Sequence, residues 1–204
     1  MTLSARRLGK NVRTLEPSAR EALMDAAESA MGTRGVHAVS VSDLCSSSGY
    51  PNGSLYHHFG SKAGLLVAVL ERGFARVHSD IALATSESVA AADRTFVYFH
   101  AVARSVDAHP LFHRLVVFVF LECRHDDAIR AVVEPFRQAL ISEGTEQVHS
   151  TLSVYGSNIT VEAARELAQS LTAWLIGLFI VDASDIPGRV RRQVDALVAD
   201  AAAH

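Results

Sequence analysis

Several residue types are scarce in this chain of 204 residues, and each scarcity excludes a class of protein. The two cysteines, Cys45 and Cys123, stand far apart, so neither a disulfide scaffold nor a zinc finger is indicated. The longest apolar runs, 115–121 and 173–181, are much shorter than the ~18 residues that span a bilayer. With five prolines and no low-complexity tract, the chain shows no long linker.

The chain also lacks a large excess of charge of either sign, with a formal net charge of -3. Residues 1–80 nevertheless carry 9 Lys/Arg and 7 Asp/Glu, whereas residues 81–204 carry 10 and 15. The first 13 residues hold cations and no acid, which suits a phosphate-binding surface or, alternatively, a solvated tail. No apolar segment follows these cations, so they do not form a signal peptide, and we expect a cytoplasmic protein without membrane contact.

The spacing of apolar residues predicts an all-α protein. Near the N-terminus we expect an amphipathic helix at 19–34, a helix from Ser40 with Asp43 in a capping box, a short helix at 51–57, and a helix from Ser61 to the low eighties. Further helices are expected at 93–106, 110–124, 126–142, 161–182 and 187–202, with a loop at 150–160. The run 115–121 also fits a buried strand, but no partner strand is visible, so we predict a helix that is apolar on all sides.

The segment from Ser40 to Lys62 has the pattern of a helix-turn-helix, with two short helices joined by a tight turn at Gly49. Its end, Leu55-Tyr-His-His-Phe-Gly-Ser-Lys62, is more specific than that pattern. On these residues the chain resembles the tetracycline-repressor (TetR) family of bacterial transcription regulators, and the close match covers about 19–70. The resemblance implies a basic flexible arm at 1–18, a DNA-binding domain at 19–60, a connecting helix at 61–84, and an effector-binding and dimerisation domain at 85–204.

The candidate DNA contacts fall into two chemical classes. A phenol, an imidazole and an ammonium can all donate to phosphate oxygens, so phosphate contacts are expected from Tyr56, His57 and Lys62. Bases are expected to be read at the exposed start of the recognition helix, by Pro51, Asn52, Gly53 and Ser54. Ser40 and Ser42 are either additional DNA contacts or helix caps, and Tyr56 and Phe59 could instead pack the small core.

The recognition segment departs from the family pattern at three positions. The family often has Ser at the position of Pro51, Lys or Arg at that of Asn52, and Glu at that of Ala63. These departures leave the fold expectation intact. They indicate a DNA-contact surface that is poor in charge.

The C-terminal part is rich in aromatic residues, and the resemblance implies that it encloses a small-molecule pocket. An aromatic stripe at helical spacing can equally be plain core. The candidate effector-binding residues, for a largely apolar effector, are Phe96, Phe99, His100, Arg104, Phe112, His113, Phe120 and Trp174. His109 and His113 are four apart and would share a helix face, so a metal site with Cys123 and His125 stays an alternative, although we assign no metal or other cofactor.

The apolar faces at 167–179 and 190–198 would bury each other and leave apolar surface for a four-helix dimer interface, as the resemblance implies. No common catalytic motif is present, so we do not expect an enzyme. The sequence therefore predicts a homodimeric, ligand-responsive regulator of a palindromic double-stranded DNA operator, most simply a repressor released by a small apolar effector. The alternative is a helical small-molecule or metal-binding protein that no longer binds DNA.

Overall fold

The computed structural model describes residues 18–86, 89–181 and 185–202, and within these ranges the chain is all-α, as predicted. The predicted basic arm, apart from Ser18, and residue Asp182 lie outside the described residues. The elements in chain order are α1 (Ala19–Arg34), α2 (Val41–Ser48), α3 (Asn52–Phe59), α4 (Lys62–Thr85), η1 (Ala91–Asp93), α5 (Arg94–Ala108), α6 (Pro110–Glu122), α7 (Asp127–Val154), α8 (Val161–Val181) and α9 (Ile186–Ala202).

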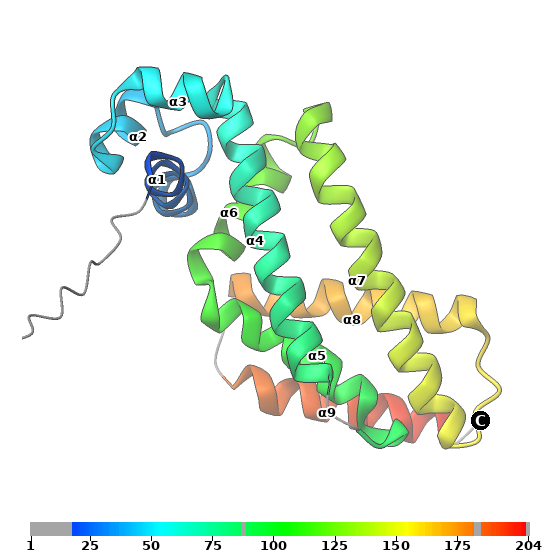
Figure 1. Cartoon of the computed structure of the whole chain (residues 1–204). Coiled ribbons are helices and arrows are strands. Elements are labelled where there is room, and N and C mark those ends of the chain that lie inside the picture. Colours follow the sequence, from blue (N-terminus) through cyan, green and yellow to red (C-terminus); the bar gives the residue numbers. More distant parts are fainter. Residues whose placement is uncertain (1–17, 87–88, 182–184, 203–204) are drawn as a thin grey trace, which may run out of the picture.

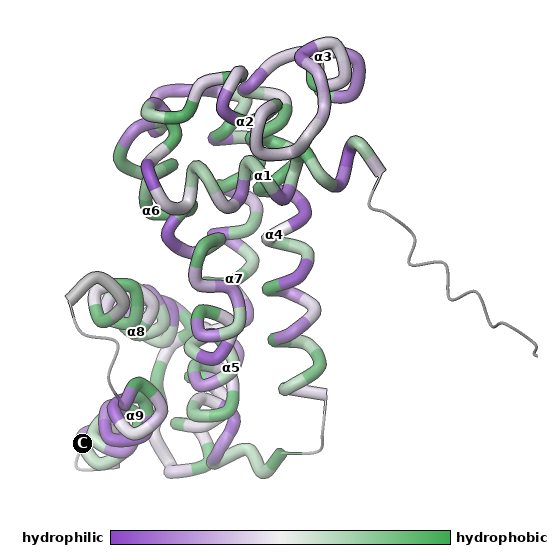
Figure 2. The backbone as a smooth tube through the Cα atoms, turned by 90° about the vertical axis from the view of Figure 1, so that its left-hand side faces the viewer, coloured by the Kyte–Doolittle hydropathy of each residue, from purple (hydrophilic) through white to green (hydrophobic). Residues whose placement is uncertain are grey.

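The helices are arranged as a small head on a larger body (Figure 1). Helices α1, α2 and α3 form the head, and α4 runs from the end of α3 down into the body. In the body, α5 and α7 lie between α4 on one side and the pair α8 and α9 on the other (Figure 2). One buried cluster extends from Leu23 and Leu55 in the head, along α4, to Leu171 and Val194, so the head is not separated from the body by a solvated gap.

Local capping signals fix the helix ends in the head. Ser40 and Asp43 form the predicted capping box, in which the Ser40 side chain accepts from the Asp43 N–H and the Asp43 carboxylate accepts from the Ser40 N–H. Gly49 ends α2 in the left-handed conformation, with φ 76°, which glycine adopts without a steric penalty. The Ser61 hydroxyl accepts from the Gly64 N–H and begins α4, as predicted.

Helix α7 is much longer than the predicted helix at 126–142, and it includes 150–154, for which the sequence predicts a loop. The extension is stabilised by tertiary packing, because Thr151 and Leu152 are buried. The Thr151 hydroxyl also donates to the Ala91 carbonyl oxygen and accepts from the Thr95 N–H. No local sequence signal announces these contacts with η1 and α5, which explains why the loop prediction is wrong for this segment.

The apolar run 115–121 is helical, which confirms the choice of helix over strand. Leu115 and Val119 face the core and are almost fully buried, whereas Leu121 is 72% exposed. The run 115–121 is therefore apolar all round in sequence but buried on one side only. The Phe112 ring of α6 packs so closely over Gly73 of α4 that a Cβ at this glycine would clash with the ring.

Candidate nucleic-acid interface and effector clefts

The recognition helix α3 is anchored by one residue and exposes most of the others. Leu55 is fully buried, whereas Asn52, Gly53 and His57 are exposed and Tyr56 is 53% exposed. A Cβ at Gly53 would meet no heavy atom within 4 Å, so the start of the helix is open to an approaching surface. Asn52, Gly53 and Ser54 thus lie on one short, accessible helix with two of the predicted phosphate-binding residues, and Pro51 precedes this helix as its N-cap.

The third predicted phosphate contact, Lys62, has a partner within the protein. Its Nζ donates to the Val36 carbonyl oxygen over 2.7 Å, across the turn between α1 and α2. An ammonium group has three N–H donors, so this bond leaves donors for a phosphate oxygen. Helix α3 ends at Phe59, where the Tyr56 carbonyl accepts from the Gly60 N–H. Helix α4 begins at Lys62, so Lys62 directly follows the recognition helix.

The structure places the two serines of α2 differently. Ser40 caps the helix, and its hydroxyl and N–H both bond to Asp43. These bonds, the backbone one first, lower the pKa of the Asp43 carboxyl. Ser42 is exposed in the first turn of α2. Ser40 therefore has the helix-capping role that the sequence offers as its alternative, and Ser42 is available for contact.

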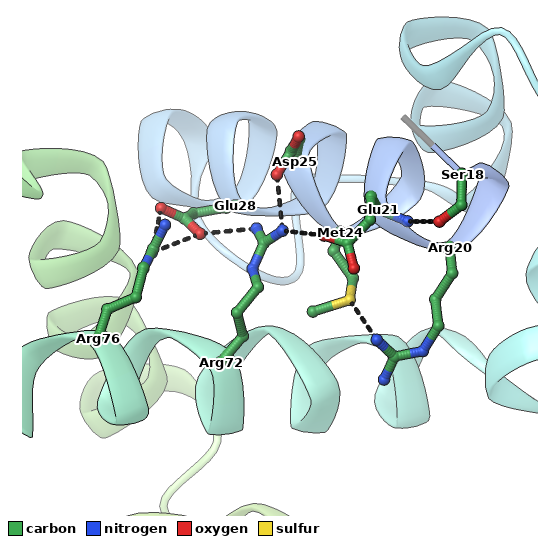
Figure 3. A network of polar contacts seen from close by, with 8 residues as sticks. All are labelled: Ser18, Arg20, Glu21, Met24, Asp25, Glu28, Arg72 and Arg76. Carbon is green, nitrogen blue, oxygen red and sulfur yellow. Dashed lines mark hydrogen bonds and ion pairs between the residues drawn. The ribbon is translucent and has the colours of Figure 1, made fainter. Parts of the chain in front are cut away.

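The head is held to α4 by a network of ion pairs that the sequence does not predict (Figure 3). Arg72 of α4 bonds to three carboxylates of α1, at 3.3 Å to Glu21, 2.7 Å to Asp25 and 3.0 Å to Glu28. Arg76, one turn further along α4, bonds to Glu28 at 2.8 Å. The only sequence signal is the helical spacing of acids on α1 and of arginines on α4, which does not reveal that the two faces meet.

A second connection joins the head to α6. The Glu122 carboxylate, at the end of α6, accepts from the His37 N–H over 2.8 Å. Gly35, at the end of α1, has φ 92°, and a Cβ there would lie 2.6 Å from the same carboxylate. The turn after α1 is therefore bonded to Lys62 of α4 and to Glu122 of α6, so the position of the head depends on both helices.

The candidate effector residues lie in different surroundings. Phe99 and Phe112 are buried in the core, and Phe112 lies edge-on to Phe74. Phe120 is 45% exposed on the outer side of α6. The others are dispersed: Phe96 stacks on His100, the His113 ring bonds to Ser105, Arg104 is exposed, and Trp174 is half-buried on α8.

Two small clefts open on the body. The first, between α4, α5 and α7, has a volume of about 140 Å³ and is lined by His78, Ile81, Ala82, Thr85, Tyr98, Glu143 and Gln147. The second, about 250 Å³, lies between η1, α5 and α9 and is lined by residues that include Phe96, Tyr155 and Arg191. Arg191 lies 4.8 Å from the centre of the Phe96 ring and pairs with Asp93 and Asp195. Phe96 is thus the one candidate effector residue that lines either of these two clefts.

The histidines considered for a metal site have separate partners. His109 is the N-cap of α6, one helical turn before His113, and its ring contacts Asp80 at 2.9 Å. Burial lowers the pKa of His113 to about 4. Among the described residues, no group of three or more His, Cys, Asp or Glu side chains could hold a metal ion.

Comparison with known proteins gives matches over the head and over most of the chain. Residues 23–69 match the family model of bacterial regulatory proteins, tetR family. The HTH-type transcriptional regulator BetI of Rhizobium meliloti (strain 1021) is 23% identical over 166 residues, which cover 81% of this chain and 78% of that protein.

Solved structures share the fold. A bacterial regulatory protein in the tetR family from Rhodococcus RHA1 gives a TM-score of 0.74 at 17% identity, covering 91% of this chain and 98% of that one. A protein assigned as a transcriptional regulator from Saccharomonospora viridis, solved in complex with choline, gives a TM-score of 0.75 at 19% identity, covering 89% of this chain and 95% of that one. No described helix of the present chain is long and apolar enough to cross a membrane.

Proposed function

Since the chain belongs to the tetR family of bacterial regulatory proteins, we propose that this transcriptional regulator is a homodimeric repressor, which binds a palindromic operator and leaves it when a small effector binds the body. The observation that carries the proposal is the geometry of α3. Its Asn52, Gly53 and Tyr56 are exposed together, while the buried Leu55 fixes the helix on the head.

The roles of the head residues follow from their chemistry. Asn52 and Ser54, at the start of α3, are proposed to contact base edges, because an amide can bind adenine through two hydrogen bonds and a hydroxyl can bind several bases. Tyr56, His57 and Lys62 are proposed to contact phosphates and so to fix the register of α3 in the major groove. Pro51, Gly53 and Ser42 supply the surrounding contact surface.

The proposed dimer interface is the outer face of α8 and α9. Helix α8 packs on α7, and α9 packs on α5, so the described parts of the two helices do not chiefly bury each other, contrary to the expectation from the sequence. Ile176 of α8 is 46% exposed, and Trp174 and Leu197 are half-buried, which leaves apolar surface for a second copy. A two-fold dimer would set its recognition helices about one DNA turn apart, ~34–36 Å, and would match a palindrome.

The proposed effector is small. The two clefts of about 140 and 250 Å³ are below the roughly 300–1,000 Å³ of common ligand sites, and each carries charged side chains. Their linings support a compact, partly polar effector better than the small, largely apolar one that the aromatic content suggests. The Saccharomonospora viridis protein in complex with choline supports a small-molecule site on this fold.

The proposal is tested by measuring binding of the purified protein to labelled DNA from upstream of its own gene. Fluorescence anisotropy is followed at several salt concentrations, with a scrambled duplex of the same length as control. We expect binding at least about 1,000-fold tighter to one palindromic segment than to the scrambled duplex. If no segment is preferred at physiological salt, the alternative of a helical ligand-binding protein that no longer binds DNA replaces this proposal.

A further inference from the structure

A contact between a basic and an acidic side chain joins α4 to α7 across the cleft between α4, α5 and α7. His78 Nε2 of α4 lies 3.2 Å from Glu143 Oε1 of α7, and both residues line the cleft. The side chains remain 55% and 36% exposed, so the contact lies at the mouth of the cleft, where solutes can reach it. An exposed pair of this kind contributes little stability and can be exchanged for another partner.

The second carboxylate oxygen of Glu143, Oε2, makes only a weak hydrogen bond. It lies 3.5 Å from the Tyr98 hydroxyl, at the limit of a hydrogen bond. The single proton of this hydroxyl is directed to the Leu140 carbonyl oxygen, which is 2.9 Å away. The carboxylate of Glu143, which lines the cleft, thus keeps acceptor capacity.

The remaining lining suits a compact ligand with an apolar surface. Ile81 and Ala82 of α4 and the ring of Tyr98 form the apolar part of the wall. Among the residues that line this cleft, Glu143 is the only acid and His78 the only basic side chain. A volume of about 140 Å³ corresponds to roughly five water molecules at liquid density, which is room for a ligand of few heavy atoms.

Building on the proposed function, we propose that this cleft binds a small organic cation, and that the cation takes Glu143 from His78. The carboxylate then neutralises the ligand charge, and the aromatic Tyr98, which also lines the cleft, lies beside the cationic group. In the exchange His78 loses its partner on α7, so the ligand replaces a bond between two helices with a bond between itself and one of them.

This exchange takes place on α4, the helix to which the head is bonded. His78 lies on α4 two residues after Arg76, which holds Glu28 of α1 (Figure 3). Breaking the bond between His78 and Glu143 removes one restraint between α4 and α7, while α4 stays bonded to α1. A ligand can shift an equilibrium only by its different affinity for the two arrangements, and here the difference is whether His78 competes for Glu143.

The test uses two probes of the same shape and different charge, choline and its uncharged carbon analogue 3,3-dimethylbutan-1-ol. Isothermal titration calorimetry of the full-length protein measures each affinity. We expect choline to bind at least about tenfold more tightly than the neutral probe, since the neutral probe cannot form the charge pair with Glu143.

Two substitutions should shift choline affinity in opposite directions. Glu143→Gln should weaken it about tenfold, and His78→Gln should strengthen it about threefold, because the competitor is removed. Glu146→Gln, which removes an acid from the same helix at an exposed position outside the cleft, is the matched control and should change nothing. A purely structural role for the pair would make both cleft variants weaker.

The proposal is overturned if neither probe binds at millimolar concentration, if both bind equally, or if His78→Gln weakens choline binding. Operator binding is measured on the same preparations. This measurement distinguishes a failure of the cation-site inference from a failure of the proposed function. Specific DNA binding without cation binding rejects only this inference. Absence of specific DNA binding rejects the proposed function, whatever the calorimetry shows.

Discussion

Lys62, the first residue of α4, donates its side-chain N–H to the main-chain carbonyl oxygen of Val36 over 2.7 Å. The bond joins the helix that follows the recognition helix to the turn between α1 and α2. In the same turn, the His37 N–H donates to the Glu122 carboxylate of α6. A residue proposed to bind phosphate therefore also belongs to the joint between head and body.

Replacing Lys62 by Ala should affect both DNA binding and stability. Removing one cation per subunit should weaken specific and non-specific binding alike, and it should lower the salt dependence of log affinity by about one for each phosphate that is no longer neutralised. Loss of the bond to Val36 should cost about 1 kcal/mol of stability. Anisotropy titrations at several salt concentrations and urea unfolding measure the two effects.

Arg192→Ala removes a cation from α9 at the base of the body and should leave the salt dependence unchanged. An unchanged salt dependence for Lys62→Ala would reject the phosphate contact.

Replacing Asn52 by Ala should change sequence preference with little change in salt dependence. Asn52 is exposed at the first position of α3, and a good two-bond contact to a base contributes about 1–3 kcal/mol of discrimination. The preference for one base should weaken at one position in each half-site. Competition with singly substituted operators measures this change. If every substituted operator keeps its wild-type ranking, Asn52 does not read a base.

The parts of the fold that the sequence predicts are the locally determined ones. Ser40 with Asp43, Gly49 and Ser61 set helix ends through contacts within three or four residues, and the ends of their helices are predicted correctly or within two residues. The extension of α7 through Thr151 depends on contacts with Ala91 and Thr95, more than fifty residues away. No local pattern encodes them, so the predicted helix is too short.

The same distinction applies to the candidate sites. The exposed face of α3 follows from helix periodicity and the single anchor Leu55, so its residues can be found from the sequence. The first cleft combines His78, Tyr98 and Glu143 from three helices, and the sequence predicts none of them. Phe112 is predicted for the pocket because it is aromatic, but its ring fills the space over Gly73. Aromatic content identifies residues that pack, and only the tertiary arrangement shows which of them leave a cavity.

Ile176→Asp should separate the proposed dimer without unfolding the subunit. The side chain is 46% exposed in the single chain, so a carboxylate there remains solvated in the monomer but would be buried at the interface. Leu175→Asp is the contrasting variant, because Leu175 is only 1% exposed and its replacement should unfold the subunit itself. Sedimentation velocity with circular dichroism distinguishes the outcomes. A folded Ile176→Asp protein that is still dimeric at micromolar concentration would place the interface elsewhere.

His113 should make the protein less stable in mild acid. Burial lowers its pKa to about 4 from an ordinary value of 6.5, so the unfolded chain binds the proton more readily between these values. The free energy of unfolding is highest above pH 6.5. It decreases by about 3 kcal/mol in all as the pH falls towards 4. Urea unfolding of His113→Gln should show a flatter pH dependence over this range. His125→Gln, at an exposed position, should retain the wild-type profile, and a wild-type profile in His113→Gln would contradict the assignment.

Glu28→Gln should weaken the attachment of the head to α4. Glu28 is 15% exposed and accepts from both Arg72 and Arg76, so its loss leaves two guanidinium groups with fewer partners in a partly desolvated place (Figure 3). We expect a loss of about 1–3 kcal/mol in the free energy of unfolding. Asp127→Asn breaks a pair with Arg130 in which Asp127 is 94% exposed, and it should leave the unfolding midpoint nearly unchanged. Because the network orients α1, Glu28→Gln should also weaken operator binding. Equal losses in the two variants would show that the network contributes no more than an ordinary surface pair.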